Sequence, residues 1–275
     1  MIFRFLLISF LLIAVIPVLP QSNPGSYSPD GRLAVSVSGD IWVVQFVNTP
    51  TIKDDTTIVK GEWVQITRGK YNDHDPVWSP DGNAIIFSSD RNGPHDIWQI
   101  NISHDNVSQD LKLIIETQED ETQPDIAQNG SMVWVRGAGA DANLWYKTNN
   151  GKEEQLTTAI GAENSPAFSP DGTTIAYISE HKKSKQLHIL HLQSKSDKVI
   201  EGSFSPEFPE WSPDGTRITF STRGRNAGVW ITTPNGTYRN LISTLRASST
   251  WSKDGSHITL ISLPPTPPSY NGDPD

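Results

Sequence analysis

The chain has 275 residues, and 22 basic side chains against 31 acidic ones give it a formal net charge of −9. An acidic chain of this kind lacks the clustered lysine and arginine that a general nucleic-acid-binding protein needs. Its sequence contains no cysteine, which excludes disulfides, thiol catalysis and cysteine-bound zinc or iron–sulfur clusters.

The N-terminal 22 residues have the pattern of an export signal. Arg4 precedes an apolar run from Phe5 to Leu19 that only Ser9 and Pro17 interrupt. One positive charge followed by about fifteen apolar residues is typical of a signal peptide, and the run is short for a membrane-spanning helix of about 20 residues. We therefore expect residues 1–22 to be a signal peptide or an uncleaved N-terminal anchor. The protein is then extracytoplasmic, either periplasmic or secreted.

A tetrapeptide recurs along the rest of the chain. Intact Ser-Pro-Asp-Gly copies end at Gly31, Gly82, Gly172 and Gly215, and degenerate copies end at Gly130 and Gly255. Proline presets φ at the second position of a turn, and glycine accepts the positive φ that a hairpin bulge requires. The tetrapeptide therefore joins two antiparallel strands, and its recurrence predicts six copies of one supersecondary unit.

Five of the six units contain four short strand patterns. In the second unit Trp78 comes just before the turn, Ile85 and Phe87 alternate after it, and strand-like segments follow at 96–98 and 113–115. Alternation with period two is typical of a half-buried strand. Four strands in a unit of about 40–45 residues form the blade of a β-propeller. The sequence therefore predicts an all-β propeller over residues 23–263, followed by a proline-rich acidic tail at 264–275.

The sixth unit is incomplete. It supplies strand patterns at 248–251 and 257–261 and then runs into Pro264, Pro265, Pro267 and Pro268, which cannot pair within a central strand. We expect six blades with an unfinished last one. Five blades plus an extra hairpin also fit the pattern, as does an incomplete fragment of a longer propeller.

The repeated signature Pro-x-Trp-Ser-Pro-Asp-Gly, followed by Asp-Ile-Trp, resembles the propeller repeat of the TolB C-terminal domain and its exported relatives. The resemblance covers residues 24 to about 263, and it implies a propeller of TolB-like repeats. TolB also carries an α/β domain ahead of its propeller. Between the predicted export signal and the first repeat we find no room for that domain.

The loops that join one unit to the next converge around one mouth of a propeller's central channel, and in this chain they are acidic. An acidic ring favours a cation or a basic peptide segment. The alternative is that charged loops only keep the surface soluble. The residues that we expect to bind a ligand at this mouth are Asp73, His74, Asp75, Glu121, Gln123, Glu163, Asn164, Glu207, Arg91 and Arg223.

Motifs of catalysis are missing from the sequence: it has no nucleophile elbow, no His-Glu-x-x-His, no phosphate loop and no EF-hand. We therefore expect a non-enzymatic scaffold that uses no cofactor. Its partner is an envelope or extracellular protein or peptide, with membrane contact only through an uncleaved N-terminal segment. The alternative is a metal-dependent carbohydrate-active enzyme similar to polysaccharide lyases. There His74, His95 and His181 would hold a divalent cation.

Overall fold

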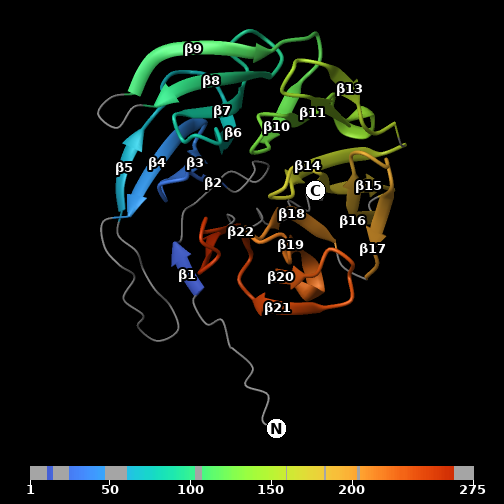
Figure 1. The fold of residues 1–275 in the computed structure, drawn as a ribbon. Helices are drawn as coiled ribbons and strands as arrows, with labels where there is room; N and C mark the ends of the chain where they lie inside the picture. Colours follow the sequence, from blue (N-terminus) through green and yellow to red (C-terminus); the bar gives the residue numbers. More distant parts are fainter. Residues whose placement is uncertain are drawn as a thin grey trace, which may run out of the picture.

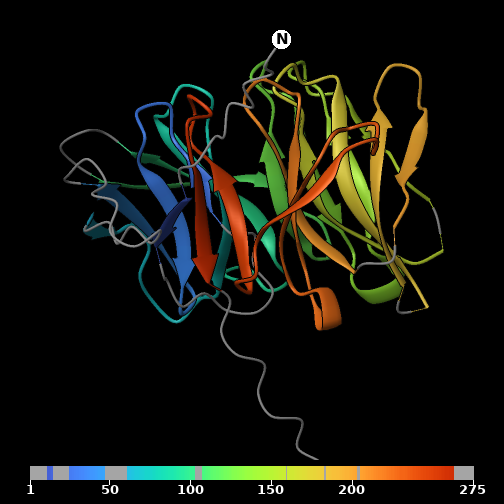
Figure 2. The ribbon, with the colours of Figure 1, turned by 90° about the horizontal axis from the view of Figure 1, so that it is seen from below.

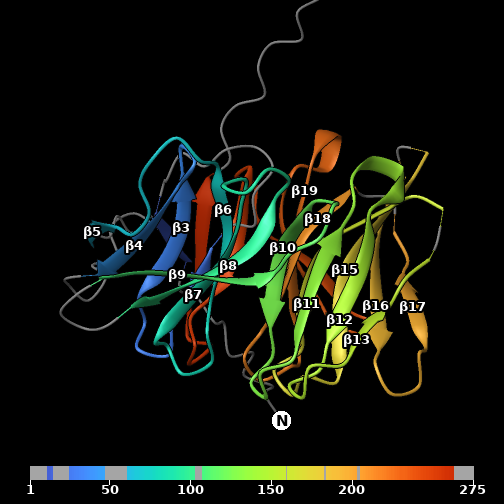
Figure 3. The same ribbon diagram turned by 90° about the horizontal axis from the view of Figure 1, so that it is seen from above.

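The chain folds into a ring of β-sheets around a central axis (Figure 1). The computed structural model describes residues 11–14, 25–46, 61–102, 107–158, 160–182, 184–202 and 205–262. Five of its sheets have four strands, and a sixth has three. In the five four-stranded sheets the first strand lies near the centre of the ring, and the last strand lies at the periphery. Figures 2 and 3 show the strands running between two opposite faces, where the loops and turns gather.

Five blades are antiparallel sheets of consecutive strands. Blade 1 comprises β2 (Ser26–Tyr27), β3 (Leu33–Val37), β4 (Asp40–Phe46) and β5 (Gly61–Gln65). Blade 2 comprises β6 (Asp73–Trp78), β7 (Ala84–Ser89), β8 (Asp96–Ile102) and β9 (Val107–Ile115). Blade 3 comprises β10 (Glu121–Ile126), β11 (Met132–Arg136), β12 (Asn143–Lys147) and β13 (Glu153–Gln155).

The next two blades repeat this order. Blade 4 comprises β14 (Ala162–Phe168), β15 (Thr174–His181), β16 (Ser184–His191) and β17 (Asp197–Ile200). Blade 5 comprises β18 (Pro206–Trp211), β19 (Ile218–Thr222), β20 (Gly228–Thr232) and β21 (Arg239–Ser243). Short 3₁₀ helices, η1 (Gly139–Asp141) and η2 (Gly224–Asn226), follow β11 and β19. Among the described residues no helix is long and apolar enough to cross a membrane.

The repeated tetrapeptide forms the hairpin turn that its residues predict. In blade 2 the N–H of Gly82 donates to the carbonyl of Ser79 at 2.9 Å, and Gly82 adopts a φ of 72°. Asp81 accepts hydrogen bonds from the Ser79 hydroxyl at 2.6 Å and from the Asn83 N–H at 3.1 Å. The degenerate copy that ends at Gly255 closes in the same way, with a φ of 68° and a 2.9 Å bond to Ser252. Lysine in place of proline leaves the turn intact.

Large side chains fill the space between neighbouring blades. Trp78 of blade 2 is 3% exposed and packs with Ile41 and Val43 of blade 1. Trp211 of blade 5 packs in the same way against blade 4, and its indole N–H donates to the carbonyl of Ala167 at 3.1 Å. Burial of these side chains removes apolar surface from water at both of these blade junctions, which stabilises the ring.

The sixth blade closes the ring. It consists of β22 (Ala247–Trp251) and β23 (Ile258–Ser262), with β1 (Leu11–Ala14) added in parallel along β23. The Tyr27 hydroxyl of blade 1 lies 2.6 Å from the Thr259 hydroxyl of β23, and Ile261 packs in the core of blade 1. Among the described residues the sixth unit supplies two strands of its own, as the sequence predicts.

The described residues do not test the predictions for the two ends of the chain. β1 comes from within the predicted export signal, and it is the part of residues 1–22 that the structure describes. The tail at 264–275 lies outside the described residues. Export, signal cleavage and these domain boundaries stay predictions.

Candidate functional site

Two sets of loops meet at one face of the ring, which we call the mouth. One set joins each blade to the next, and the other joins the second and third strands of a blade. Ion pairs connect the two sets: Asp73 at the start of β6 lies 2.6 Å from Arg91 after β7. Glu121 at the start of β10 lies 2.8 Å from Arg136 at the end of β11. The repeated turns lie at the other end of the inner strands, on the opposite face of the ring. We call this face the turn face.

A β-bulge recurs near the mouth in four consecutive inner strands. The pairing register shifts within β6, β10, β14 and β18. At the shift one residue adopts a left-handed φ, and these residues are Asp75 (54°), Gln123 (53°), Ser165 (52°) and Phe208 (51°). A non-glycine residue in this conformation costs about 1–2 kcal/mol. Its recurrence at one position of the repeat makes the bulge a built feature of the mouth rather than an accident of one strand.

The bulges are connected from blade to blade by hydrogen bonds. The N–H of Gln123 donates to Oδ2 of Asp75 at 3.1 Å. The N–H of Ser165 donates to Oε1 of Gln123 at 2.6 Å. Asp75 and Gln123, both predicted to bind a ligand, therefore hold blades 2, 3 and 4 in register. Phe208, at the same position of blade 5, has no acceptor on its side chain.

The predicted acidic residues are buried rather than exposed. Asp73, Asp75, Glu121, Glu163 and Glu207 are at most 5% exposed. Besides the two ion pairs above, Glu207 accepts hydrogen bonds from Lys185 and Arg223 at 2.5 Å each. Glu163 accepts from the Thr157 hydroxyl at 3.1 Å. Three of the five carboxylates are thus paired with a basic side chain of the mouth itself. Direct binding of a cation or a basic peptide by these carboxylates remains a prediction.

Several carboxyl groups at the mouth have raised pKa values, because hydrogen bonds and ion pairs do not fully compensate for their burial. Burial raises the pKa of Glu121, against the opposing bonds from Thr117 and Arg136. Asp96 is 2% exposed, and burial, followed by the charges of Glu121 and Glu116, raises its pKa to about 6. Oδ1 of Asp96 and Oε2 of Glu121 are buried without a hydrogen-bond partner. Such costly burial is typical of functional sites, and neither the burial nor this grouping is visible in the sequence.

Two of the three predicted metal-binding histidines lie together. The rings of His74 and His95 are 4.7 Å apart between centroids. Nδ1 of His74 is 2.7 Å from Asp75, and Nδ1 of His95 is 3.3 Å from Asp120. His181 belongs to blade 4, where its Nδ1 lies 2.9 Å from the carbonyl of Ile160. Within the described part of the chain, which includes all three histidines, no group of three or more His, Cys, Asp or Glu could hold a metal ion.

Apolar side chains stand exposed on the loops that join the blades at the mouth. Tyr71 is 38% exposed, Leu245 44% and Ile160 84%. Tyr71 and Leu245 each precede the inner strand by two residues, and the guanidinium of Arg91 lies 5.4 Å from the Tyr71 ring centroid. Sequence reasoning missed this set because it weighed only charge in these loops.

The remaining predicted residues also lie at the mouth. Asn164 is half-buried beside the third bulge, and its Oδ1 accepts a hydrogen bond from the Ser165 hydroxyl at 3.2 Å. The side chain of Arg223 is 39% exposed while it pairs with Glu207. The side chain of His74 still reaches solvent, with 17% of its surface exposed. The structure therefore gathers all ten predicted residues on one face, as parts of a buried polar layer under an exposed rim.

Comparison by sequence gives matches to parts of known proteins. No family model matches the chain. It is 27% identical over 133 residues to a TolB homologue of Chlorobium luteolum, a stretch that covers 48% of this chain and 29% of that protein. It is 28% identical over 134 residues to the uncharacterized protein Atu1656 of Agrobacterium fabrum, covering 44% of each. The chain spans less than half the length of these curated relatives.

Comparison by structure gives matches along most of the ring. A structure assigned as TolB from Agrobacterium tumefaciens superposes with a TM-score of 0.66 at 18% identity, over 87% of this chain and 90% of that one. TolB from Acinetobacter baumannii gives 0.59 at 20% identity, over 78% and 52%. An oligogalacturonate lyase in complex with manganese gives 0.52 at 14%, over 88% and 67%. At these identities a match shows the fold alone. The repeats, the ring of blades and these matches together identify the fold of the chain as a β-propeller of TolB-like repeats.

Proposed function

We propose that this propeller is an exported, non-enzymatic scaffold that binds a protein or peptide of the cell envelope or extracellular space at its mouth. The observation that carries the proposal is the exposed apolar rim of Tyr71, Ile160 and Leu245 above a rigid polar layer. Tyrosine and arginine are among the side chains that dominate protein interfaces, and Tyr71 lies against Arg91. The bulges fix the polar layer beneath the rim. The rim therefore loses little conformational freedom on binding.

The chemistry of the mouth also favours a kind of partner. Half-buried polar groups such as Gln123 and Asn164 can bond to a peptide backbone or to polar side chains beneath the rim. The net charge of −9 attracts a basic partner at long range. We therefore favour a partner segment with apolar anchors flanked by basic residues. Steering would come from the whole protein's charge, and the short-range contacts from the rim.

Site-specific photocrosslinking in cells tests this proposal. A photoreactive amino acid is placed at Ile160 or Leu245 on the mouth, and at Tyr238 or Leu241 as controls. Tyr238 and Leu241 are 47% and 37% exposed and belong to blade 5 away from the mouth. We expect the mouth positions to give the same discrete adduct and the controls to give none. Equal adducts from both sets, or adducts from the controls alone, would contradict the proposal.

Export is tested separately by cell fractionation. The full chain is compared with the double variant Leu6→Asp, Leu12→Asp, which places two charges within the apolar run of the predicted signal. We expect the full chain outside the cytoplasm and the variant retained inside, because a charged h-region does not support export. Both proteins in the cytoplasm would overturn the assignment of compartment and leave the binding face untouched.

A further inference from the structure

A cavity lies at the turn face, away from the mouth and unused by the proposed function. Its volume is about 150 Å³, and the ends of three inner strands, β10, β14 and β18, line it together with the turns that follow β10 and β14. Its two acidic lining residues are Asp125 of blade 3 and Glu210 of blade 5. Blade 4 lies between them and contributes Ala167 at the same repeat position.

The repeat explains why two carboxylates meet here. The position before the large inner-strand residue holds Ser26, Val77, Asp125, Ala167, Glu210 and Thr250 in the six blades. Only blades 3 and 5 carry an acid at this position, and the small Ala167 between them leaves the space that forms the cavity. The Phe168 N–H donates to Oδ2 of Asp125 at 2.6 Å, so Asp125 is held against blade 4.

No positive charge faces the pair within the described lining. Besides Asp125 and Glu210, the side chains of the cavity wall that carry a polar group are Gln128, Ser169 and Trp211. The Ser169 hydroxyl is already engaged, as a donor to Asp171 at 2.6 Å and as an acceptor from the Thr174 N–H at 3.0 Å. None of the three blades adds a Lys, Arg or His to this wall.

Both groups resist ionisation. Burial raises the pKa of Asp125 to about 6, against the opposing N–H bonds of Phe168 and Ile126. Burial, and after it the charge of Asp125, raises the pKa of Glu210 well above its ordinary value of 4.5. Two like charges in one cavity cannot both form without a large repulsion. The folded protein therefore holds protons on this pair up to a higher pH than the unfolded chain does.

We propose that Asp125 and Glu210 form a pH-sensitive lock between blades 3, 4 and 5. With a proton bound, the pair stabilises the packing of the three blades at the turn face. When the pair loses its protons, uncompensated negative charge in the cavity weakens that packing. The lock depends on the fold alone, so its failure and the failure of binding at the mouth are separate outcomes.

The sign of the effect follows from linkage. A carboxyl group whose pKa is raised in the folded state binds more protons than it does in the unfolded chain, so stability falls as pH rises from the unfolded pKa to the folded one. For Asp125 that window runs from 3.8 to about 6. A shift of about two pKa units corresponds to a change of about 100-fold in the unfolding equilibrium constant. Glu210 adds to the change in the same direction.

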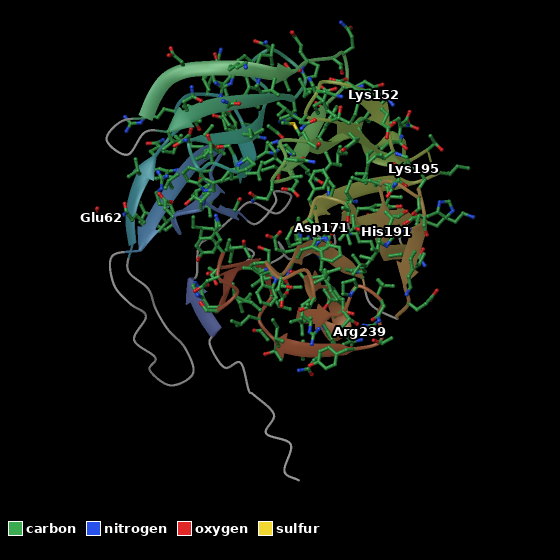
Figure 4. All side chains as sticks on the ribbon, viewed as in Figure 1. Glu62, Lys152, Asp171, His191, Lys195 and Arg239 are labelled. Carbon is green, nitrogen blue, oxygen red and sulfur yellow. The ribbon has the colours of Figure 1, made fainter. Side chains whose placement is uncertain are left out.

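Thermal unfolding across pH tests the lock. The protein is compared at pH 4.5 to 8 with the double variant Asp125→Asn, Glu210→Gln and with Glu62→Gln, an exposed carboxylate at the outer edge of blade 1 (Figure 4). We expect the Tm of the unmodified protein to fall between about pH 4.5 and 7 relative to the double variant, and Glu62→Gln to follow the unmodified protein. Parallel curves for all three proteins would overturn the lock.

Two further measurements keep the test decisive. Carbon-13 NMR of the side-chain carboxyl groups reads each residue in the unmodified protein, so it gives an answer even if a variant fails to fold. We expect Asp125 to titrate near pH 6, and titration of both groups below pH 5 would overturn the proposal. In the third measurement CaCl₂ is added at pH 7.5. A rise in Tm for the unmodified protein and none for the double variant would assign a cation site instead of a proton lock.

Discussion

The N–H of Ser165 donates a 2.6 Å hydrogen bond to Oε1 of Gln123, which occupies the corresponding bulge of the preceding blade. The Gln123 N–H in turn donates to Asp75 at 3.1 Å. Left-handed backbone at each bulge accompanies these contacts. The strain of the bulges is thus offset by bonds that tie the inner strands of three blades into one rigid layer at the mouth.

Gln123→Ala removes the acceptor of the Ser165 N–H, and Ser165 is only 4% exposed. An unsatisfied buried donor costs about 1–3 kcal/mol, so we expect the free energy of unfolding to fall by about that amount. Denaturant unfolding measures it. Gln186→Ala, which shortens an exposed glutamine on β16, is the control and should change stability by less than about 0.5 kcal/mol. A loss of the same size in both variants would show that the bulge bonds are not stabilising.

Arg136→Met removes the ion-pair partner of the Glu121 carboxylate, which is 0% exposed. Removal of one partner of a buried ion pair costs about 3–5 kcal/mol, whereas replacement of both partners by apolar residues costs much less. We therefore expect the double variant Arg136→Met, Glu121→Leu to be more stable than Arg136→Met alone. Equilibrium unfolding of the single and double variants measures the difference.

Lys152→Met is the surface control for that pair. Lys152 lies at the outer part of blade 3 (Figure 4), 74% exposed, and pairs with Glu154 at 3.7 Å. Exposed ion pairs contribute about 0–1 kcal/mol. If Arg136→Met were no more harmful than Lys152→Met, the buried ion pairs of the mouth would not contribute to stability.

His74 and His257 should titrate on opposite sides of the ordinary histidine value of 6.5. Burial lowers the pKa of His74, but the charges of Asp75, Asp73 and Asp90 outweigh it and the net shift is upward. Burial lowers the pKa of His257, with Asp254 opposing it. Proton NMR of the two imidazoles measures both. Titration of His74 below His257 would contradict the ion pair with Asp75.

The same shift predicts a pH dependence of stability. A histidine with a raised pKa contributes stability that is fully present below pH 6.5 and is lost as pH rises through the folded pKa. We therefore expect His74→Gln to lose stability relative to the unmodified protein below pH 6.5 and to approach it at higher pH. Thermal unfolding of the two proteins at pH 5.5 and 8.5 checks this, and a constant difference at both values would count against it.

The strand pattern could be predicted because the information is local. Each Asp-Gly turn and each alternating strand is specified within about ten residues, so even the copy ending at Gly255, with lysine in place of proline, was assigned correctly. The bulges could not be predicted in this way. Asp75, Gln123, Ser165 and Phe208 share a left-handed φ but no side-chain chemistry, so the pairing of the strands and not the residue type determines the conformation.

The sequence predicts where the charged residues of the mouth lie, but not that their carboxylates are buried and paired. Counting charges in loops treats every carboxylate as exposed, whereas Glu121 and Glu163 are completely buried and Glu121 pairs with Arg136. Contacts between blades are also invisible to a local reading. Asp125 and Glu210 meet only because the ring brings alternate blades to one cavity.

The most direct test of the binding role is the affinity of the crosslinked partner, once purified, for two matched tyrosine variants. Tyr71 at the mouth and Tyr238 away from it are both exposed, and each has an arginine guanidinium 5.4 Å from its ring centroid. Calorimetry should show that Tyr71→Ser raises the Kd by about 10-fold or more, as for an interface anchor. Tyr238→Ser should leave the Kd unchanged. Unchanged affinity for Tyr71→Ser together with a loss for Tyr238→Ser would contradict the assignment of the mouth as the binding face.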